Sequence, residues 1–472
     1  MKMNSFLCCL TALLFNGLAR ADVISDWNKT ASDYLTQNAS SQYGRGMAMV
    51  HVAQFDAVNA VLGGYTPYVL DVVAPGASPE AAAAQAAYTV LTNLSRGGLS
   101  TLNSALSRSL TAVPDGPAKD AGIALGRLAA TRIIQLRAAD NPDLPITPPS
   151  SQAVGKWRIT PPNSSPGQGG NMRYMLPWTM RSPAQFRPGP PPALASDQYA
   201  ADLEEVRLLG GRVSTNRTPD IAQAADFHYA GSRTFLNAVV ARPAVPLIES
   251  ARLFALVYML EMDATIAFFE AQYAYNLWRP YSAIRLAEND GNDATTADPA
   301  WNPFFDTPNH PEYPSGTCTG TSAIIHFLIS IHGDDFGFTV RSENTPSAGM
   351  RTYPRLSAMI DDAVVARIAA GAHFRNSCVV GVELGQRIAR HALENFLRPV
   401  PHFTGAARLS TGEFQLHFNP GRSVSYVIET SGDLSQWMPW QTNIYGAILQ
   451  NDPGAPADRR FFRALIQPGV VE

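Results

Sequence analysis

The feature that most limits the fold of this chain is a series of long segments in which apolar residues recur at helical spacing. Residues 43–62 show this spacing throughout, and residues 78–94 start with a capping serine and have a glutamate in the first turn. A third segment begins at about Pro117, and the alanine content of these segments predicts close helix packing. Further helices are predicted at residues 196–211 and 218–231, from about 246 to 275, and at about 317–331, 354–371 and 376–396.

The C-terminal part of the chain has a different pattern. After about residue 404, short β-rich runs alternate with turn residues, and segments such as YVIETSGDLSQW resemble the β-sandwich modules at the ends of many exported bacterial proteins. Trp437 and Trp440 provide either a ligand-binding surface or packing groups. We therefore predict a mainly α chain, with a helical-bundle domain over residues 22–403 and a small β-sandwich over residues 404–472.

The N-terminus has the pattern of a secretory signal peptide. Lys2 supplies the positive charge, an apolar run extends from Phe6 to Phe15, and a small-x-small tripeptide ends at Ala21. We expect residues 1–21 to be cleaved off after Ala21 and the protein to be exported to the periplasm or the extracellular space. A membrane anchor is the alternative, but the apolar run is too short to span a bilayer comfortably.

The composition argues against several classes of protein. Apolar residues make up 46% of the chain and charged residues 16%, so a large core can form. Lys and Arg number 36 against 39 Asp and Glu, and this net charge of −3 without long basic runs argues against nucleic-acid binding. The apolar run at residues 253–269 is interrupted by Glu261 and Asp263, which indicates a buried helix and no membrane span.

Residues 141–195 are rich in proline and glycine. A loop of this length in a compact enzyme usually wraps the surface or frames a pocket, and a flexible linker is the alternative. The interspersed aromatic residues Trp157, Tyr174, Trp178 and Phe186 favour a packed loop.

Two segments combine polar donors with a break in the chain. Arg279 precedes Pro280, which places it at a helix end or bend, where its planar guanidinium can bind an oxyanion. In HPEYPSGT, residues 310–317, Ser315 adds a hydroxyl donor and Gly316 allows a close backbone approach. The helix that follows has free N–H groups that favour anions. A surface arginine paired with a carboxylate and an ordinary turn are the alternatives.

A third segment, ARIAAGAHFRNS at residues 366–377, places Arg367 and His373 six positions apart. Together, the three segments resemble the vanadium-dependent haloperoxidases and the related type 2 phosphatidic acid phosphatases. That family has Lys, six residues and Arg-Pro, then Pro-Ser-Gly-His, then Ser-Arg, five residues, His, three residues and Asp. The chain keeps these spacings, and the resemblance, to the exported bacterial haloperoxidase-like branch, covers about residues 40–397.

The resemblance implies a helical haloperoxidase-like domain with a site for vanadate, where phosphate competes. Arg279 and Arg367 would hold the equatorial oxygens by charge-assisted hydrogen bonds, and Ser315 and the N–H of Gly316 would add donors. His373 matches the histidine that ligates vanadium in haloperoxidases and attacks phosphorus in the phosphatases. The implied partners are small anions, peroxide, and halide or an organic substrate, and the implied assembly is a homodimer.

Four positions depart from the family pattern: Gln272 stands for the lysine, Thr317 for the acid–base histidine, Ala366 for the serine and Ser377 for the final aspartate. Gln272, Thr317 and Ser377 each lose a group that carries charge or moves protons. A positioned acid–base group is worth about 100- to 10,000-fold in rate, so we predict that halide oxidation is weakened or lost. We interpret other nearby polar residues as structural or supporting, namely Arg285, His310, Glu312 and Arg375.

Four functions stay open from the sequence. They are a haloperoxidase, a phosphate-ester hydrolase, an oxyanion-binding pseudoenzyme and a rearranged chemistry in the same pocket without vanadate. After cleavage only Cys318 and Cys378 remain, next to the replaced histidine and aspartate. Because the resemblance implies that their helices face each other, we predict Cα atoms within about 7 Å and a disulfide, with two buried free thiols as the alternative.

Overall fold

The computed structural model describes residues 22–400, apart from positions 96, 141, 145, 147, 148, 164 and 165 and segments 230–244 and 342–348. Beyond residue 400 it describes residues 402–408, 410, 414–419, 426–442, 448–450 and 461–466. The predicted signal peptide lies outside the described residues. In the part of the chain that is described, no helix has the length and apolar character needed to cross a membrane.

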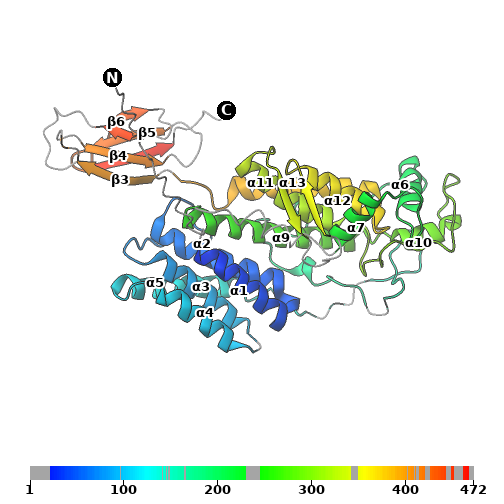
Figure 1. Ribbon diagram of the computed structural model, residues 1–472. Helices are drawn as coiled ribbons and strands as arrows, with labels where there is room; N and C mark the ends of the chain where they lie inside the picture. Colours follow the sequence, from blue (N-terminus) through cyan, green and yellow to red (C-terminus); the bar gives the residue numbers. More distant parts are fainter. Residues whose placement is uncertain are drawn as a thin grey trace, which may run out of the picture.

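The body of the molecule is helical, in two groups joined by one long helix (Figure 1). The first group comprises α1 (Val23–Asn38), α2 (Tyr43–Leu62), α3 (Pro79–Asn93), α4 (Leu99–Thr111) and α5 (Pro117–Leu136). The second comprises α6 (Asp197–Leu209), α7 (Pro219–Tyr229), α10 (Pro280–Arg285), α11 (Gly316–His332), α12 (Ala358–Ala369) and α13 (Arg375–Asn395). The long helix, α9 (Leu247–Tyr275), packs against α2 on one side and against α11 and α13 on the other.

Close helix packing depends on small residues at the crossings. A Cβ on Gly126 of α5 would lie 2.3 Å from the carbonyl oxygen of Ala82 in α3. A Cβ on Gly385 of α13 would lie 2.3 Å from the carbonyl oxygen of Thr319 in α11, and a Cβ on Gly381 would lie 2.7 Å from that of Ser315. These glycines bring the backbones of α11 and α13 together, and the start of α11 is the predicted anion loop.

The predicted helices are present, with shifts of a few residues at some ends. Ser78 caps α3 by accepting from the Ala81 N–H, as its sequence indicates. The sequence reasoning missed α1, α4 and a hairpin of β1 (Phe338–Arg341) with β2 (Met350–Tyr353). In α4 only Leu102 and Ala105 are buried, and its serines and threonines have modest helix propensity.

The proline-rich segment is a packed loop, as predicted, and most of its interspersed aromatic residues are buried or half-buried. Trp157 and Trp178 are buried and Phe186 is half-buried, but Tyr174 is 59% exposed and does not anchor the loop. The loop is tied to α9 by Asp263, whose carboxylate accepts from the backbone N–H groups of Trp178 and Thr179 at 2.6 and 2.7 Å. The two interrupting acids predicted a buried helix, and Asp263 is fully buried.

The C-terminal strands form two three-stranded antiparallel sheets. One has the order β3 (His402–Arg408), β4 (Phe414–Asn419), β7 (Ile448–Gln450), and the other β6 (Met438–Thr442), β5 (Tyr426–Ser431), β8 (Phe461–Ile466). Leu416 and Phe418 from one sheet form a core with Ile428 and Trp440 from the other, which makes this module a small sandwich. The Trp437 ring lies under the Arg463 guanidinium, 4.3 Å from its carbon.

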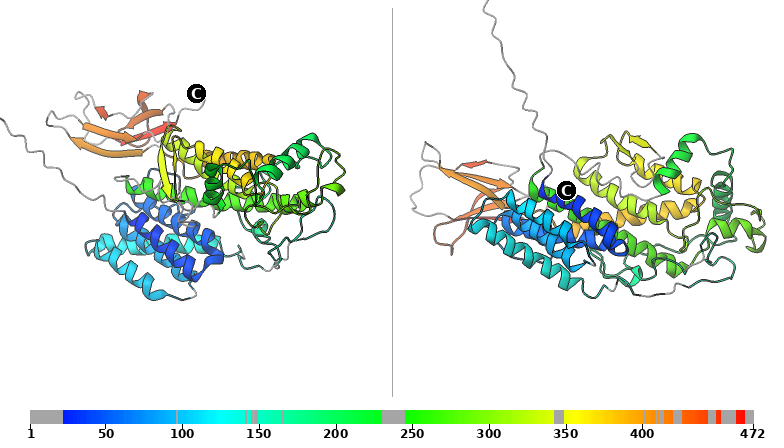
Figure 2. Two further views of the ribbon diagram at one scale, coloured as in Figure 1. Left: turned by 45° about the vertical axis from the view of Figure 1, so that its right-hand side comes forward. Right: turned by 60° about the horizontal axis from the view of Figure 1, so that its bottom comes forward.

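The β-sandwich lies at the end of the molecule opposite α6 and α10 in every view (Figure 2). The predicted division of the chain at residues 403/404 stays a prediction, and strand β3 starts at His402. Because Arg279 directly precedes α10, the sandwich is remote from the candidate site.

Candidate functional site

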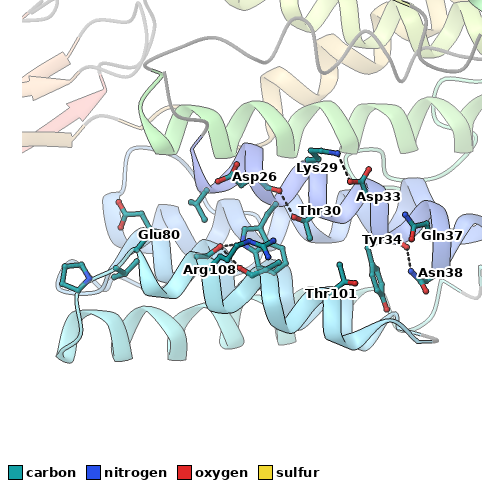
Figure 3. A pocket seen from close by; sticks show the side chains of 17 residues that line it. Asp26, Lys29, Thr30, Asp33, Tyr34, Gln37, Asn38, Glu80, Thr101 and Arg108 are labelled. Carbon is teal, nitrogen blue, oxygen red and sulfur yellow. Dashed lines mark hydrogen bonds and ion pairs between the residues drawn. The ribbon is translucent and has the colours of Figure 1, made fainter. Parts of the chain in front are cut away.

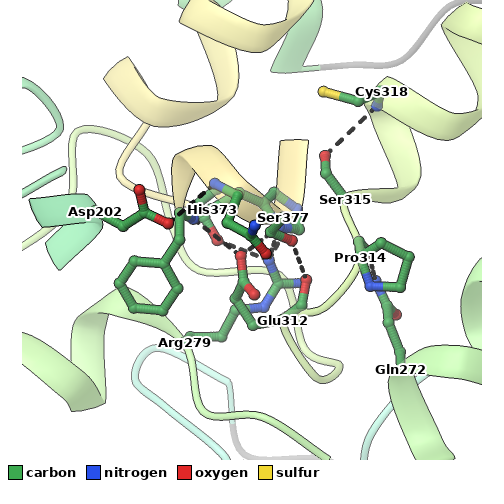
Figure 4. Close-up of polar contacts among 12 residues, drawn as sticks. Asp202, Gln272, Arg279, Glu312, Pro314, Ser315, Cys318, His373 and Ser377 are labelled. Carbon is green, nitrogen blue, oxygen red and sulfur yellow. Dashed lines mark hydrogen bonds and ion pairs between the residues drawn. The ribbon is translucent and has the colours of Figure 1, made fainter. Parts of the chain in front are cut away.

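Helix ends and loops hold the predicted site residues in the second helical group (Figure 4). Arg279 is the N-cap of α10, Ser315 is the N-cap of α11, and Arg367 lies in the last turn of α12. His373 lies in the short connection between α12 and α13. These four side chains are at most 4% exposed, although they come from segments far apart in the sequence.

Backbone contacts fix the connection from α9 to α10 and the chain that leads into α11. Asn276 ends α9 in a left-handed conformation with φ 53°, and its N–H donates to the Gln272 carbonyl. Pro280 occupies the first turn of α10, where a missing N–H costs nothing. The Ser315 N–H donates to the Ser377 carbonyl at 3.0 Å, which joins the start of α11 to α13.

Arg279 is enclosed by hydrogen bonds to backbone and imidazole groups. Its Nε donates to the His310 carbonyl and its Nη1 to the Ala372 carbonyl, both at 2.8 Å. Nη1 also lies 3.0 Å from Nε2 of His373. Burial lowers the pKa of Arg279 to about 9, opposed by Glu312 and reinforced by Arg367.

The second arginine has a different environment. Arg367 is 4% exposed, and among the described residues its Nε and Nη1 have no hydrogen-bond partner. Its charge contributes to the lowered pKa values of Arg279 and His373, so it lies within electrostatic reach of both. Buried guanidinium N–H groups without partners are costly, and a bound anion satisfies them.

His373 is neutral at pH 7 and contacts a carboxyl group through one ring nitrogen. Burial lowers its pKa well below the usual value, and the charges of Arg279 and Arg367 lower it further. Nη1 of Arg279 lies beside the ring, 3.0 Å from Nε2 and 3.5 Å from Nδ1. Nδ1 lies 3.0 Å from Oε1 of Glu312, an oxygen that already accepts from the Phe374 N–H, and this contact favours a ring proton on Nδ1.

Glu312 is the site residue whose role the sequence reasoning missed. It is fully buried, and burial raises its pKa to about 8 against the opposing charge of Arg279. Its Oε1 also accepts from the Phe374 N–H at 2.9 Å. Glu312 and His373 are 61 positions apart, so no local pattern shows the contact. The signal in the sequence was a carboxylate flanked by prolines just before the anion loop.

The four positions that depart from the family pattern are all buried or half-buried. Gln272 is fully buried, and its amide donates to the Pro314 carbonyl at 2.8 Å, while its Oε1 lies 2.7 Å from Nδ1 of His310. Ser377 donates to the backbone carbonyl of Glu312 at 3.3 Å. Thr317 and Gly316 are half-buried in the first turn of α11, and Ala366 is fully buried in α12.

Cys318 in α11 and Cys378 in α13 are fully buried. Their side chains contact each other as hydrogen-bonding partners, and burial raises the pKa of Cys378 well above its usual value. Both thiols are free in the structure, which is the alternative that the sequence left open. Disulfide formation between them stays a prediction for the exported protein.

Comparisons with solved structures identify the fold. A bacterial vanadium-dependent iodoperoxidase superposes with a TM-score of 0.68 at 19% identity, covering 79% of this chain and 97% of that one. The apo and holo forms of a bacterial vanadium-dependent chloroperoxidase give TM-scores of 0.59 and 0.57, both at 15% identity, covering 75% and 80% of this chain and 94% and 93% of theirs. The fold is that of the vanadium haloperoxidases.

A family comparison supports this haloperoxidase-like placement. Residues 252–401 match the family model of the VCPO second helical-bundle domain, and this range contains every predicted site residue. A comparison with curated protein sequences found no match. The sequence resemblance to the haloperoxidase-like superfamily is therefore confirmed at the level of fold and domain.

The described residues outside this site offer no second candidate for this chemistry. No group of three or more His, Cys, Asp or Glu side chains in that part of the chain is placed to hold a metal cation. A groove of about 780 Å³ lies between α1 and α4 and is lined by residues that include Trp27, Tyr34 and Arg108 (Figure 3). It contains none of the predicted site residues.

Proposed function

We propose that the chain binds a tetrahedral oxyanion, phosphate or vanadate, at a site made by Arg279, Arg367 and the start of α11. The observation that carries the proposal is that two nitrogens of the buried Arg367 guanidinium, Nε and Nη1, have no hydrogen-bond partner among the described residues. Glu312 opposes the charge of Arg279, and Arg367 adds a second buried positive charge. An anion supplies the missing acceptor and the missing charge.

The start of α11 adds to the cradle. The first N–H groups of this 17-residue helix have no intrahelical acceptor, and the helix dipole favours negative charge there. A Cβ on Gly316 would lie 2.9 Å from the Phe268 ring, so glycine allows the first turn of α11 to pack closely against Phe268. The donor set therefore fits a small oxyanion.

The same residues fit vanadate through His373. With the ring proton on Nδ1 toward Glu312, the neutral imidazole has on Nε2 the lone pair that a ligand atom needs. When bound, vanadate supplies the activation of peroxide for halide oxidation. The protein groups hold oxygens through Arg279 and Arg367 and present Nε2 of His373.

Proton transfer is the weak part of this site. Thr317 cannot act as a general acid near neutral pH, and the buried amide of Gln272 is held by Pro314 and His310. We infer an anion-binding protein in which halide oxidation is weak or absent, so a pseudoenzyme is a second candidate that the same residues favour. The export and the homodimer implied by the sequence stay proposals.

Calorimetric titration with inorganic phosphate tests the proposal. The wild type should bind phosphate, and Arg367→Ala should weaken binding at least about tenfold, because a charge-assisted hydrogen bond contributes about 1.5–3 kcal/mol. Arg355→Ala is the matched control, since that side chain is 46% exposed and pairs with Asp334 and Asp361. Absence of wild-type binding at millimolar phosphate, or equal affinity in Arg367→Ala, contradicts the proposal.

A further inference from the structure

In the family that this chain resembles, an aspartate follows the vanadium-ligating histidine by four positions. Ser377 stands at that position in this chain. Ser377 Oγ donates to the Glu312 backbone carbonyl at 3.3 Å. The Glu312 carboxylate lies 3.0 Å from Nδ1 of His373. We propose that Glu312 is the positioning residue for His373 and takes over the role of the missing aspartate. This inference rests on the proposed function.

The contacts of Glu312 indicate which ring nitrogen of His373 carries the proton. Oε1 of Glu312 accepts from the Phe374 N–H at 2.9 Å and lies 3.0 Å from Nδ1 of His373, so we place the ring proton on Nδ1. Nε2 then carries the free lone pair on the side of the ring near Arg279. Fixing the tautomer and the ring plane through the second nitrogen is the usual function of a carboxylate behind a ligating histidine.

The surroundings hold the Glu312 carboxylate in place. Pro191 and Pro192 of the proline-rich loop line a small cavity of about 10 Å³ together with Tyr199, Glu312 and Ser377. Asp202 of α6 accepts from the Asn376 N–H at 3.0 Å and so fixes the start of α13. Residues of the proline-rich loop thus lie close to Glu312.

A simple charge-balancing role for Glu312 beside Arg279 is the competing explanation. The two explanations differ in their effect on two anions of similar shape. If Glu312 only balances charge, its removal should strengthen the binding of phosphate and of vanadate by the same factor. Loss of a positioning residue weakens vanadate, which uses His373 as a ligand, far more than phosphate.

The experiment is calorimetric titration of the full mature protein with orthovanadate and with inorganic phosphate. Glu312→Gln should weaken vanadate binding about 10- to 100-fold while phosphate affinity changes less than about threefold. The variant Glu312→Gln with Ser377→Asp, which restores a carboxylate at the family position, should recover most of the vanadate affinity. Glu429→Gln, which neutralises a carboxylate that pairs with Arg463 in the remote sandwich, is the matched control and should leave both affinities within about threefold.

Equal changes for the two anions, or no change in either, overturn the inference. Nitrogen-15 NMR of the wild-type imidazoles, assigned with His373→Ala, tests the contact without any anion: His373 should be protonated on Nδ1, and a proton on Nε2 overturns the inference even if Glu312→Gln fails to fold. Failure of wild type to bind either anion refutes the proposed function, whereas binding with the Nε2 tautomer refutes the role of Glu312 alone.

Discussion

At the scale of the residue, the proposed site has the arginines, the serine and the histidine of the family pattern, and other residues stand for its lysine, acid–base histidine and aspartate. Arg279, Arg367, Ser315 and His373 are buried. Thr317 occupies the position of the family's acid–base histidine. Under the proposed function, we expect binding and turnover to depend on different residues and to be separable by substitution.

Restoring the family's lysine and acid–base histidine, at two of the four replaced positions, should restore turnover. The double variant Gln272→Lys, Thr317→His should oxidise bromide at least about 100-fold faster than the wild type in the presence of vanadate and peroxide, because it regains a charge and an acid–base group. Adding His373→Ala to the double variant should abolish this gain. Robust wild-type turnover would show that another residue supplies the proton.

Asp56 gives a pH prediction away from the site. Burial raises its pKa from 3.8 to about 6, although the N–H groups of Tyr68, Val69 and Leu70 oppose the shift. The folded chain therefore binds more protons than the unfolded chain between about pH 4 and pH 6. The contribution of Asp56 to the free energy of unfolding is fully present below about pH 4 and falls as pH rises through this window.

Urea unfolding of the wild type and Asp56→Asn at several pH values between 3.5 and 7 measures this effect. The free-energy difference between the two proteins should shift against the wild type by up to about 3 kcal/mol as pH rises through the window. A difference that stays constant with pH contradicts the raised pKa.

At the scale of the element, the contact of α11 with α13 sets the geometry of the site. The two helices meet at Gly381 and Gly385, and Ser315 and Ser377 join their N-terminal ends. The order and approximate ends of most helices followed from apolar spacing and caps in the sequence. The contact between Glu312 and His373 did not, because it joins two loops that only the packed helices bring together.

The α11–α13 contact makes opposite predictions for two glycines. Gly385→Ala should lower the free energy of unfolding by about 1–3 kcal/mol, because its Cβ would lie 2.3 Å from the Thr319 carbonyl oxygen. Gly320→Ala in α11 meets no atom within 4 Å and should raise it by about 0.5–1 kcal/mol through helix propensity. Denaturant unfolding measures both, and equal effects would contradict the packing.

At the scale of the whole molecule, a haloperoxidase-like helical body carries a β-sandwich at the end remote from the site (Figure 2). The sequence predicted both parts because their apolar patterns differ in period. It did not predict α1, whose polar residues mask its buried face of Ile24, Trp27, Ala31 and Leu35.

Export makes a whole-molecule prediction. Mass spectrometry of protein secreted by an exporting bacterial host should show a mature chain that begins at Asp22, the residue that caps α1. Alkylation of that mature protein under denaturing conditions should show Cys318 and Cys378 protected as a disulfide. Full labelling of both thiols would establish the free form seen in the structure, and an intact residue 1–21 segment would contradict cleavage.

The central claim is that Arg279, Arg367 and the start of α11 form an oxyanion cradle beside His373. A crystal structure grown with orthovanadate tests it most directly, because vanadium can be located by its anomalous scattering. We predict one vanadium peak next to Nε2 of His373. The vanadate oxygens should accept hydrogen bonds from Nε and Nη1 of Arg367. A cradle without vanadium, with those two groups hydrogen-bonded to protein atoms, would contradict the account.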